Sequence, residues 1–485
     1  MIIDGLQIFF QNMERKRIYL CLAHMSDEGI EQKYVKEAFD TNWVVPLGPN
    51  VNGFEKDLEE FVCHTDITDN TDLSSPAESA DIAEMTKRVV ALSAGTAAVH
   101  LALIGCGVKP GDEVIVQSFT FCASSHPITY LGATPVFVDS ERETWNMDPE
   151  LLEEAIKDRI AKTGKKPKAI VPVALYGMPY RIDRIMEIAD RYGIPVIEDA
   201  AEGFGSRFNG QVLGTFGKYG VLSFNGNKMI TTSGGGALIT ENEDEWREIM
   251  MYATQYRESY PYYQHEKIGF NYRMSNICAG IGRGQMTVVN EHIAHHKHVQ
   301  ALYEELLKDV PGIKVHSQPS RIRELENCEH RDNANNNEFE KLGHTDITDE
   351  ASDQQKTVYD SNYWLCTITV DPEVKVKGQE NAYKTIVTGA VGGAAGVIHV
   401  AESATTDCQP NDNVEALRMA LDQAEIEARP VWKPMHKQPV YRDAPAYLNG
   451  VSEEIFKIGM CLPSGPHVTD DDVKYVVETI KRNCL

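Results

Sequence analysis

The sequence lacks the long apolar run, the paired cysteines and the excess of basic residues that mark several protein classes. No stretch approaches the roughly 18 consecutive apolar residues that a membrane-spanning helix needs, so we expect no membrane segment. Ten cysteines occur without a C-x-x-C pair, which favours reduced thiols over a disulfide framework or a zinc site. Lys and Arg number 47 against 72 Asp and Glu, giving a net charge of −25. This balance argues against a nucleic-acid or anionic-membrane surface, but not against an anionic small substrate.

Two nucleotide-binding motifs are also absent. Neither G-x-x-x-x-G-K-S/T nor G-x-G-x-x-G occurs, so the sequence predicts neither a Walker-type phosphate loop nor a nicotinamide-dependent dehydrogenase. The stretch 1–10 has a short apolar patch but no basic leader and no small-residue cleavage site. We interpret residues 1–17 as an N-terminal extension of a cytoplasmic protein.

The patterns that are present indicate an α/β protein. An apolar content of 42% over 485 residues fits a globular chain of two or three domains. Between residues 89 and 240, short apolar runs alternate with helical patterns, which predicts a mostly parallel sheet covered by helices. Helical spacing is found at 29–39, 51–61, 182–192, 243–252, 414–427 and 470–481.

Lys228 lies near the middle of the chain in a turn-rich stretch. The strand-like run 220–224 precedes it, and three glycines at 234–236 lead into a second strand-like run at 237–240. A lysine amine held on such a turn can attack a carbonyl once burial or a neighbouring cation has helped it to lose its proton. A lone lysine in a Gly-rich hairpin is more often a surface residue. Lys228 becomes a candidate catalytic residue only in combination with the segments upstream.

Asp199 ends an apolar run that follows the helical stretch 182–192. Ligands in an open parallel sheet bind beyond the carboxyl ends of the strands, which places Asp199 at a ligand site. A carboxylate there can hold a protonated ring nitrogen. The alternative is that Asp199 caps the start of a helix.

Two further strand ends carry candidate binding groups. An apolar strand breaks at Ser93-Ala-Gly95 and a helical pattern begins, which creates a possible anion site at the helix start or simply a structural turn. Phe119-Thr-Phe121 follows another strand. An aromatic ring at this edge can stack on a flat cofactor, or it can pack into the core.

Phosphate site, carboxylate and amine in this order resemble a fold-type I pyridoxal-phosphate enzyme. The details are similar to the DegT-type family of sugar-nucleotide aminotransferases, from about residue 18 to the end. The matching segments are Gln117–Phe121, Leu131–Asp139, Ile197–Ala201, Ser223–Lys228, Gly269–Asn276, Arg429–His436 and Cys461–Gly465.

The resemblance implies a cofactor, pyridoxal 5′-phosphate, and a role for each matching residue. Lys228 would form the Schiff base with the cofactor and then shuttle a proton, while Asp199 would keep the pyridine nitrogen protonated. Asn271 would reach the cofactor phosphate of a neighbouring subunit, which implies a homodimer with shared active sites. The remaining cofactor-binding residues would be Gly95, Thr96 and Ser223 at the phosphate, Phe121 on the ring, and Glu202, where many relatives carry Gln.

The family uses L-glutamate as amino donor and a nucleotide-linked keto-sugar as acceptor. The stretches 42–48 and 432–436 look most like enzymes that aminate C4 of a UDP-4-keto-6-deoxy-N-acetylhexosamine for bacillosamine-type sugars of capsules and glycans, with Trp432 and His436 binding substrate. C3 amination, a GDP-4-keto-sugar of the perosamine type, and a non-catalytic nucleotide-sugar binding protein on the same fold remain alternatives. Relatives with His in place of the lysine are dehydratases, and Lys228 argues against that activity.

The domain prediction follows from the resemblance and the composition. It comprises a large cofactor domain at 18–290 with an acidic insertion at about 64–87, then a linking helix and small domain at 291–485 with insertions at about 324–360 and 375–412. His292 and His296 lie one helical turn apart in the linking helix. Without a third ligand we interpret them as ordinary histidines of a solvent-facing helix, and we predict no metal site.

Overall fold

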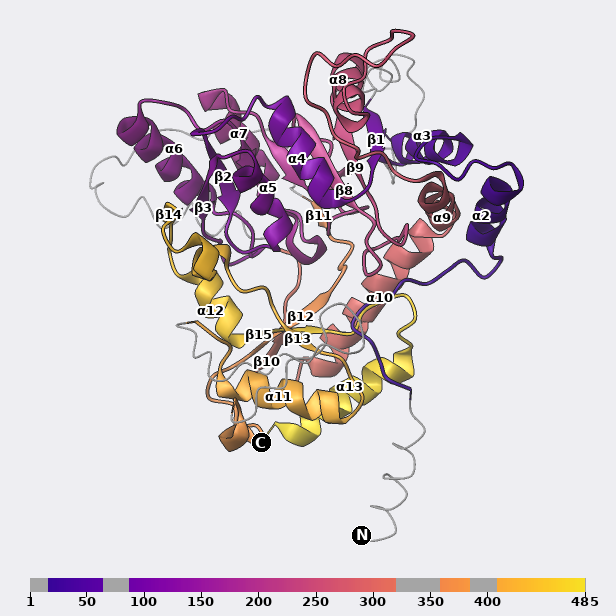
Figure 1. Cartoon of the computed structure of the whole chain (residues 1–485). Coiled ribbons are helices and arrows are strands. Elements are labelled where there is room, and N and C mark those ends of the chain that lie inside the picture. Colours follow the sequence, from indigo (N-terminus) through magenta and orange to yellow (C-terminus); the bar gives the residue numbers. More distant parts are fainter. Residues whose placement is uncertain (1–15, 64–86, 320–357, 384–407, 485) are drawn as a thin grey trace, which may run out of the picture.

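A computed structural model of the chain describes residues 16–63, 87–319, 358–383 and 408–484 (Figure 1). Most of each expected insertion, and of the N-terminal extension, lies outside these described residues. Among the described helices, none is long and apolar enough to cross a membrane.

The centre of the molecule is a sheet whose strands are parallel except for β9. Two four-stranded groups have the orders β1-β9-β8-β5 and β14-β3-β2-β4, and parallel bridges between Ile170 and Val196 and between Val173 and Asp199 join them. The strands are β1 (Arg88–Leu92), β2 (Glu113–Gln117), β3 (Thr134–Val138), β4 (Ile170–Val171), β5 (Ile197–Asp199), β8 (Tyr219–Ser223), β9 (Gly236–Thr240) and β14 (Ala446–Tyr447). The edge strand β14 comes from the region that the sequence assigns to the small domain.

Both faces of this sheet are buried, which explains why its strands read as continuous apolar runs. In β1, Val89 and Ala91 enter one hydrophobic cluster, whereas Val90 and Leu92 enter another on the opposite face. Helices α3 (Pro49–Cys63), α6 (Pro149–Thr163) and α7 (Ile182–Tyr192) contribute to the first cluster, and α4 (Gly95–Gly105), α5 (His126–Tyr130) and α8 (Glu243–Ala253) to the second. The predicted α/β fold with helices on both faces is therefore confirmed.

A second, antiparallel sheet lies in the lower part of Figure 1 and has its own buried cluster. Its order is β10-β12-β15-β13, and its strands are β10 (Ile313–Val315), β12 (Cys366–Val370), β15 (Gly459–Leu462) and β13 (Arg429–Pro430). The helices α10 (Val289–Leu307), α11 (Asp412–Gln423) and α13 (Asp470–Asn483) supply the other side of that cluster. Helix α12 (Val451–Ile458) precedes β15 directly.

The remaining elements flank the central sheet. Helix α2 (Ile30–Asp40) and helix α3 pack against α9 (Asn276–Met286), which brings the N-terminal part of the chain beside the segment that follows Asn271. A small three-stranded sheet joins β6 (Arg207–Phe208) to β7 (Gln211–Val212) and β11 (Tyr359–Asp360). The six helices predicted from periodicity all form, with ends shifted by a few residues.

Candidate active site

The predicted site residues gather where the parallel strands of the central sheet end. Asp199 is the last residue of β5 and Ser223 is the last residue of β8, and these two strands are parallel neighbours. Gly95 begins α4, three residues after the last residue of β1. Because parallel strands end at the same edge of a sheet, backbone topology alone brings these groups together.

Lys228 points into a polar and aromatic setting rather than into solvent. Its Nζ lies 3.5 Å from Oε1 of Glu202, and its side chain is only 14% exposed. The same nitrogen lies 4.0 Å from the centre of the Trp364 ring. The surface interpretation of this lysine is therefore wrong, and its amine has a carboxylate on one side and an aromatic face on the other.

Asp199 is buried and held by two donors. Ser124 donates its hydroxyl to Oδ2 at 2.6 Å, and the N–H of Ala201 donates to Oδ1 at 3.2 Å. Burial raises the pKa of Asp199, while the Ser124 hydrogen bond and the charge of Lys228 lower it. The residues between Asp199 and Arg207 form turns but no helix, so the helix-cap interpretation is wrong.

The acidic neighbours of Asp199 differ in what they contact. Glu198 faces the other way along the strand and accepts backbone N–H groups of Gly214, Phe216 and Gly217, so it supports the fold. Glu202 is buried, and its Oε2 accepts the N–H of Tyr176 at 2.7 Å. Burial raises the pKa of Glu202, and Lys228 opposes that shift.

The start of α4 has the properties of an anion site. Its N-cap residue, Ala94, has no side chain that can accept a hydrogen bond from the first turn. The first backbone N–H groups of the helix, starting at Gly95 and Thr96, are therefore not capped by a side chain of the N-cap residue. A Cβ atom added at Gly95 would lie 2.9 Å from Cβ of Ser223, and one added at Gly236 would lie 2.4 Å from the Gly95 nitrogen. Glycine at both positions therefore lets the hairpin and the helix start approach closely.

Phe121 forms an aromatic wall with Trp432 and Tyr176. Phe119 is fully buried in the core, whereas Phe121 is 50% exposed and its ring centre lies 5.3 Å from that of Trp432. Trp432 stacks on Tyr176 at 6.1 Å and donates its backbone N–H to the Tyr176 hydroxyl at 2.7 Å. The indole Nε1 of Trp432 is buried and has no hydrogen-bond partner within the described part of the chain.

The imidazole of His436 contacts other protein side chains, although the sequence predicts that it binds substrate. Its Nδ1 lies 2.7 Å from the hydroxyl oxygen of Ser118, and its Nε2 lies 3.2 Å from Oε1 of Glu453 on α12. Both ring nitrogens thus have protein partners. As placed, the imidazole anchors the segment that carries Trp432 to the end of β2.

Asn271 is exposed and lies beside the end of β1. It bridges to Thr254, and the carbonyl of the next residue, Tyr272, accepts the N–H of Ser93 at 2.8 Å. The helix that follows begins at Asn276 and is capped by Ser275, so Asn271 is not its cap.

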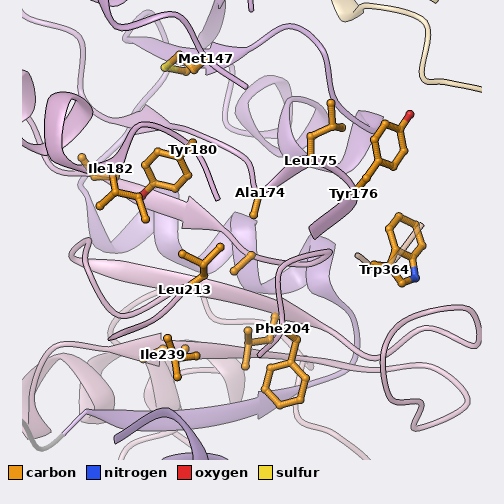
Figure 2. Close-up of a cluster of buried hydrophobic side chains, with 14 of the residues drawn as sticks. Met147, Ala174, Leu175, Tyr176, Tyr180, Ile182, Phe204, Leu213, Ile239 and Trp364 are labelled. Atoms are coloured by element: carbon orange, nitrogen blue, oxygen red, sulfur yellow. The ribbon is translucent and has the colours of Figure 1, made fainter. Parts of the chain in front are cut away.

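Three residues around the site were not predicted: Ser124, Tyr176 and Trp364. Tyr176 and Trp364 belong to the buried cluster drawn in Figure 2, and Tyr176 has a positive φ of 54°, which is uncommon for a tyrosine. No motif of the sequence marks any of the three, because each is defined by a contact with a distant segment.

The histidines of α10 also differ from expectation. His292 and His296 are buried, so the solvent-facing prediction is wrong. The described residues contain no cluster of His, Cys, Asp or Glu that could hold a metal ion.

A family model described as the DegT/DnrJ/EryC1/StrS aminotransferase family matches residues 78–331 and 383–481. The chain is 37% identical over 469 residues to a Bacillus subtilis protein named "Putative pyridoxal phosphate-dependent aminotransferase EpsN", covering 96% of this chain and 95% of that protein. It is 29% identical to the GDP-perosamine synthase of Escherichia coli O157:H7, covering 95% and 98%. A crystal structure of a DegT DnrJ EryC1 StrS aminotransferase from Brucella abortus matches with a TM-score of 0.69 at 23% identity, covering 94% of this chain and 95% of that one.

Proposed function

The chain belongs to the DegT/DnrJ/EryC1/StrS family of pyridoxal-phosphate-dependent sugar aminotransferases, and we propose that it transfers the amino group of L-glutamate to C4 of a UDP-4-keto-6-deoxy-N-acetylhexosamine. Family membership makes pyridoxal 5′-phosphate its cofactor. The observation that carries the proposed activity is the Lys228 amine, enclosed between the Glu202 carboxylate and the Trp364 ring at the sheet edge. The match over nearly the full length of EpsN supports a pyridoxal-phosphate-dependent aminotransferase, and the family and the GDP-perosamine synthases support a sugar substrate. The stretches 42–48 and 432–436 support the choice of acceptor.

The groups at this edge fit the cofactor. The start of α4, with Gly95 and Thr96, would hold its phosphate together with Ser223, because the first N–H groups there lack a side-chain acceptor. Lys228 would hold the cofactor covalently through Nζ. Asp199 would face the ring nitrogen.

When bound, the cofactor supplies a protonated pyridine ring that accepts negative charge from the substrate carbon. Asp199 stabilises the proton on that ring nitrogen, and Ser124 fixes the orientation of the carboxylate. Lys228 Nζ would move a proton between Cα of the amino acid and C4′ of the cofactor, acting first as general base and then as general acid. Glu202 stays within reach of Nζ and holds the ammonium form in place. Phe121 and Trp432 exclude water from one side, and the free indole N–H of Trp432 is a donor for the sugar nucleotide.

His436 acts on the substrate through the segment that it anchors. Because both of its ring nitrogens already have protein partners, we propose that it holds Trp432 in position instead of contacting the sugar.

The attachment of the cofactor to Lys228 is the first prediction. Borohydride reduction of the loaded, yellow enzyme should fix the cofactor on Lys228, and peptide mapping should find the label there. Lys218→Ala is the matched control, because Lys218 lies ten residues upstream and pairs with Glu245 outside the site. The label should persist in that control and vanish in Lys228→Ala. A label on any other lysine would contradict the proposed function.

A panel of keto-sugars with L-glutamate tests the acceptor. Turnover of UDP-4-keto-6-deoxy-N-acetylhexosamine should exceed that of a 3-keto analogue and of GDP-4-keto-6-deoxymannose. The similarity to GDP-perosamine synthases makes the last compound the second candidate, and preferential turnover of it would replace the UDP-sugar proposal.

We also propose a homodimer in which Asn271 completes the phosphate site of the partner. Asn271 is exposed, and large apolar side chains on the preceding loop are exposed as well, as expected of a surface covered by another subunit. These side chains are Tyr260, Tyr262, Tyr263 and Ile268.

Mixing two inactive variants tests this arrangement. Lys228→Ala removes the amine, and Asn271→Asp sets a negative charge beside the phosphate. In a twofold dimer with shared sites, a mixed dimer places both lesions in one site and leaves the other intact, so random exchange should restore about a quarter of wild-type activity. If each subunit builds its own site, every site keeps one lesion and mixing restores nothing. Mixing Lys228→Ala with Asp199→Asn is the control, and it should restore nothing because both lesions then affect groups of the same subunit.

A further inference from the structure

Helix α10 contacts both segments that surround the Lys228 amine. Nδ1 of His292 lies 3.2 Å from the carbonyl oxygen of Met229, the residue after Lys228. One turn later, Nδ1 of His296 lies 3.2 Å from the carbonyl oxygen of Tyr363, the residue before Trp364. A carbonyl oxygen only accepts hydrogen bonds, so Nδ1 carries the proton in both rings.

The loop that carries Lys228 is fixed by donors from outside it. The carbonyl of Gly226 accepts the N–H of Ala23 at 3.1 Å, and the carbonyl of Asn227 accepts the indole N–H of Trp364 at 2.6 Å. His292 supplies the donor on the other side of Lys228. Trp364 is thus tied to the lysine loop directly, and α10 is tied to both.

The segment that carries Trp364 is strained where His296 holds it. Tyr363 has a φ of 49°, a left-handed conformation that costs free energy in a residue with a side chain. The hydroxyl of Ser361 accepts the Tyr363 N–H at 3.0 Å, and His296 donates to the Tyr363 carbonyl. Hydrogen bonds therefore hold both backbone polar groups of Tyr363.

The burial of His296 indicates that its imidazole has a role other than filling the core. The side chain is fully buried, and burial lowers its pKa to about 3, so the ring is neutral at physiological pH. Its Nε2 has no partner among the described residues, which costs free energy that an apolar residue would avoid. The donor at Nδ1 is what an apolar residue could not provide.

We propose that His292 and His296 are positioning residues that fix the Lys228 loop and Trp364 to one helix and thereby set the separation between the Lys228 amine and the Trp364 ring. The inference rests on the proposed role of Lys228. It assigns a function to the two histidines beyond filling the core, because each acts on the backbone next to a residue of the site.

Substitution by Asn and by Gln separates positioning from simple packing. The amide nitrogen of Asn takes roughly the place of Nδ1 and keeps the donor, whereas that of Gln lies near the place of Nε2 and loses it. The variants are His292→Asn, His292→Gln, His296→Asn and His296→Gln. His298→Gln is the control on the same helix, because His298 is exposed and bonds Asp470 instead.

The readout is the rate at which formaldehyde and cyanoborohydride methylate Lys228 in the cofactor-free protein, measured by peptide mass spectrometry with Lys218 as internal reference. Losing one buried hydrogen bond should change the Lys228 rate about fivefold in each Gln variant, while the Asn variants and His298→Gln stay within about twofold of wild type. Equal rates in the Asn and Gln variants, whatever their thermal stability, overturn the inference.

Where a Gln variant does not fold, nuclear magnetic resonance of ¹⁵N-histidine-labelled wild-type protein decides. The Nδ1–H resonances of His292 and His296 should shift when the cofactor is reduced onto Lys228, and unchanged resonances overturn the inference. Failure of the proposed function is separate, since it would appear as a borohydride label on another lysine while the methylation rates remain readable.

Discussion

Lys228→Ala should lower kcat/KM for amino transfer by roughly four orders of magnitude, which corresponds to about 5.5 kcal/mol of lost transition-state stabilisation. In the proposed mechanism Nζ both holds the cofactor and moves the proton, so one substitution removes two functions. The fold should survive, because Lys228 lies in a loop and its main contacts are one carboxylate and one ring. Circular dichroism and single-turnover kinetics with L-glutamate measure the two effects.

Lys228→Arg is the matched variant that keeps the charge. Arginine can still face Glu202 and Trp364, but its guanidinium does not give up a proton in proteins. It should therefore be as inactive as alanine. A small amine such as methylamine should restore part of the activity in Lys228→Ala, where space has opened, and none in Lys228→Arg. Turnover of the arginine variant within tenfold of wild type would show that the amine does not carry the proton.

The sequence predicts those site residues that strand order brings together. Asp199 and Ser223 end neighbouring parallel strands, and Gly95 starts the helix after another strand, so their common edge follows from topology. These relations depend on local pattern and on one rule of sheet architecture.

The residues that the sequence misses depend on contacts between distant segments. Trp364 lies more than a hundred residues after Lys228 and reaches it only because the second sheet packs beside the first. His292 and His296 read as a polar stripe of an exposed helix, since nothing local shows that two backbone carbonyls lie opposite them. Polar side chains buried for a single hydrogen bond have no periodic signature.

His436 illustrates the same limit from the other side. A resemblance indicates that this position matters, but the direction of its ring depends on Ser118 at the end of β2 and Glu453 on α12. A histidine with two protein partners positions a segment, whereas one with a free nitrogen can bind a ligand. Only the hydrogen bonds distinguish these roles.

Asp199→Asn should lower kcat by about two to three orders of magnitude, or about 3–4 kcal/mol, while cofactor affinity falls by less than about tenfold. Asn has the same shape: its amide oxygen can still accept the N–H of Ala201, and its NH2 can donate to the hydroxyl oxygen of Ser124. Without a negative charge, however, it cannot keep a ring nitrogen protonated. Because burial raises the pKa of Asp199, its charge costs free energy in the folded chain, and the neutral variant should not melt below wild type.

Glu198→Gln is the control for Asp199→Asn. Glu198 precedes Asp199 in β5 and is equally buried, but it accepts three backbone N–H groups away from the site. Gln has one acceptor oxygen and no charge, so at least one of the three N–H groups loses its acceptor and the others lose a charged one. The melting temperature should therefore fall, with kcat of the folded enzyme within about twofold of wild type. The two variants should therefore behave oppositely: Asp199→Asn loses turnover but not stability, and Glu198→Gln loses stability but not turnover. Near-normal turnover of Asp199→Asn would mean that the ring nitrogen is paired elsewhere, whereas a fall in kcat of both variants would trace the loss to disturbance of β5 rather than to the charge of Asp199.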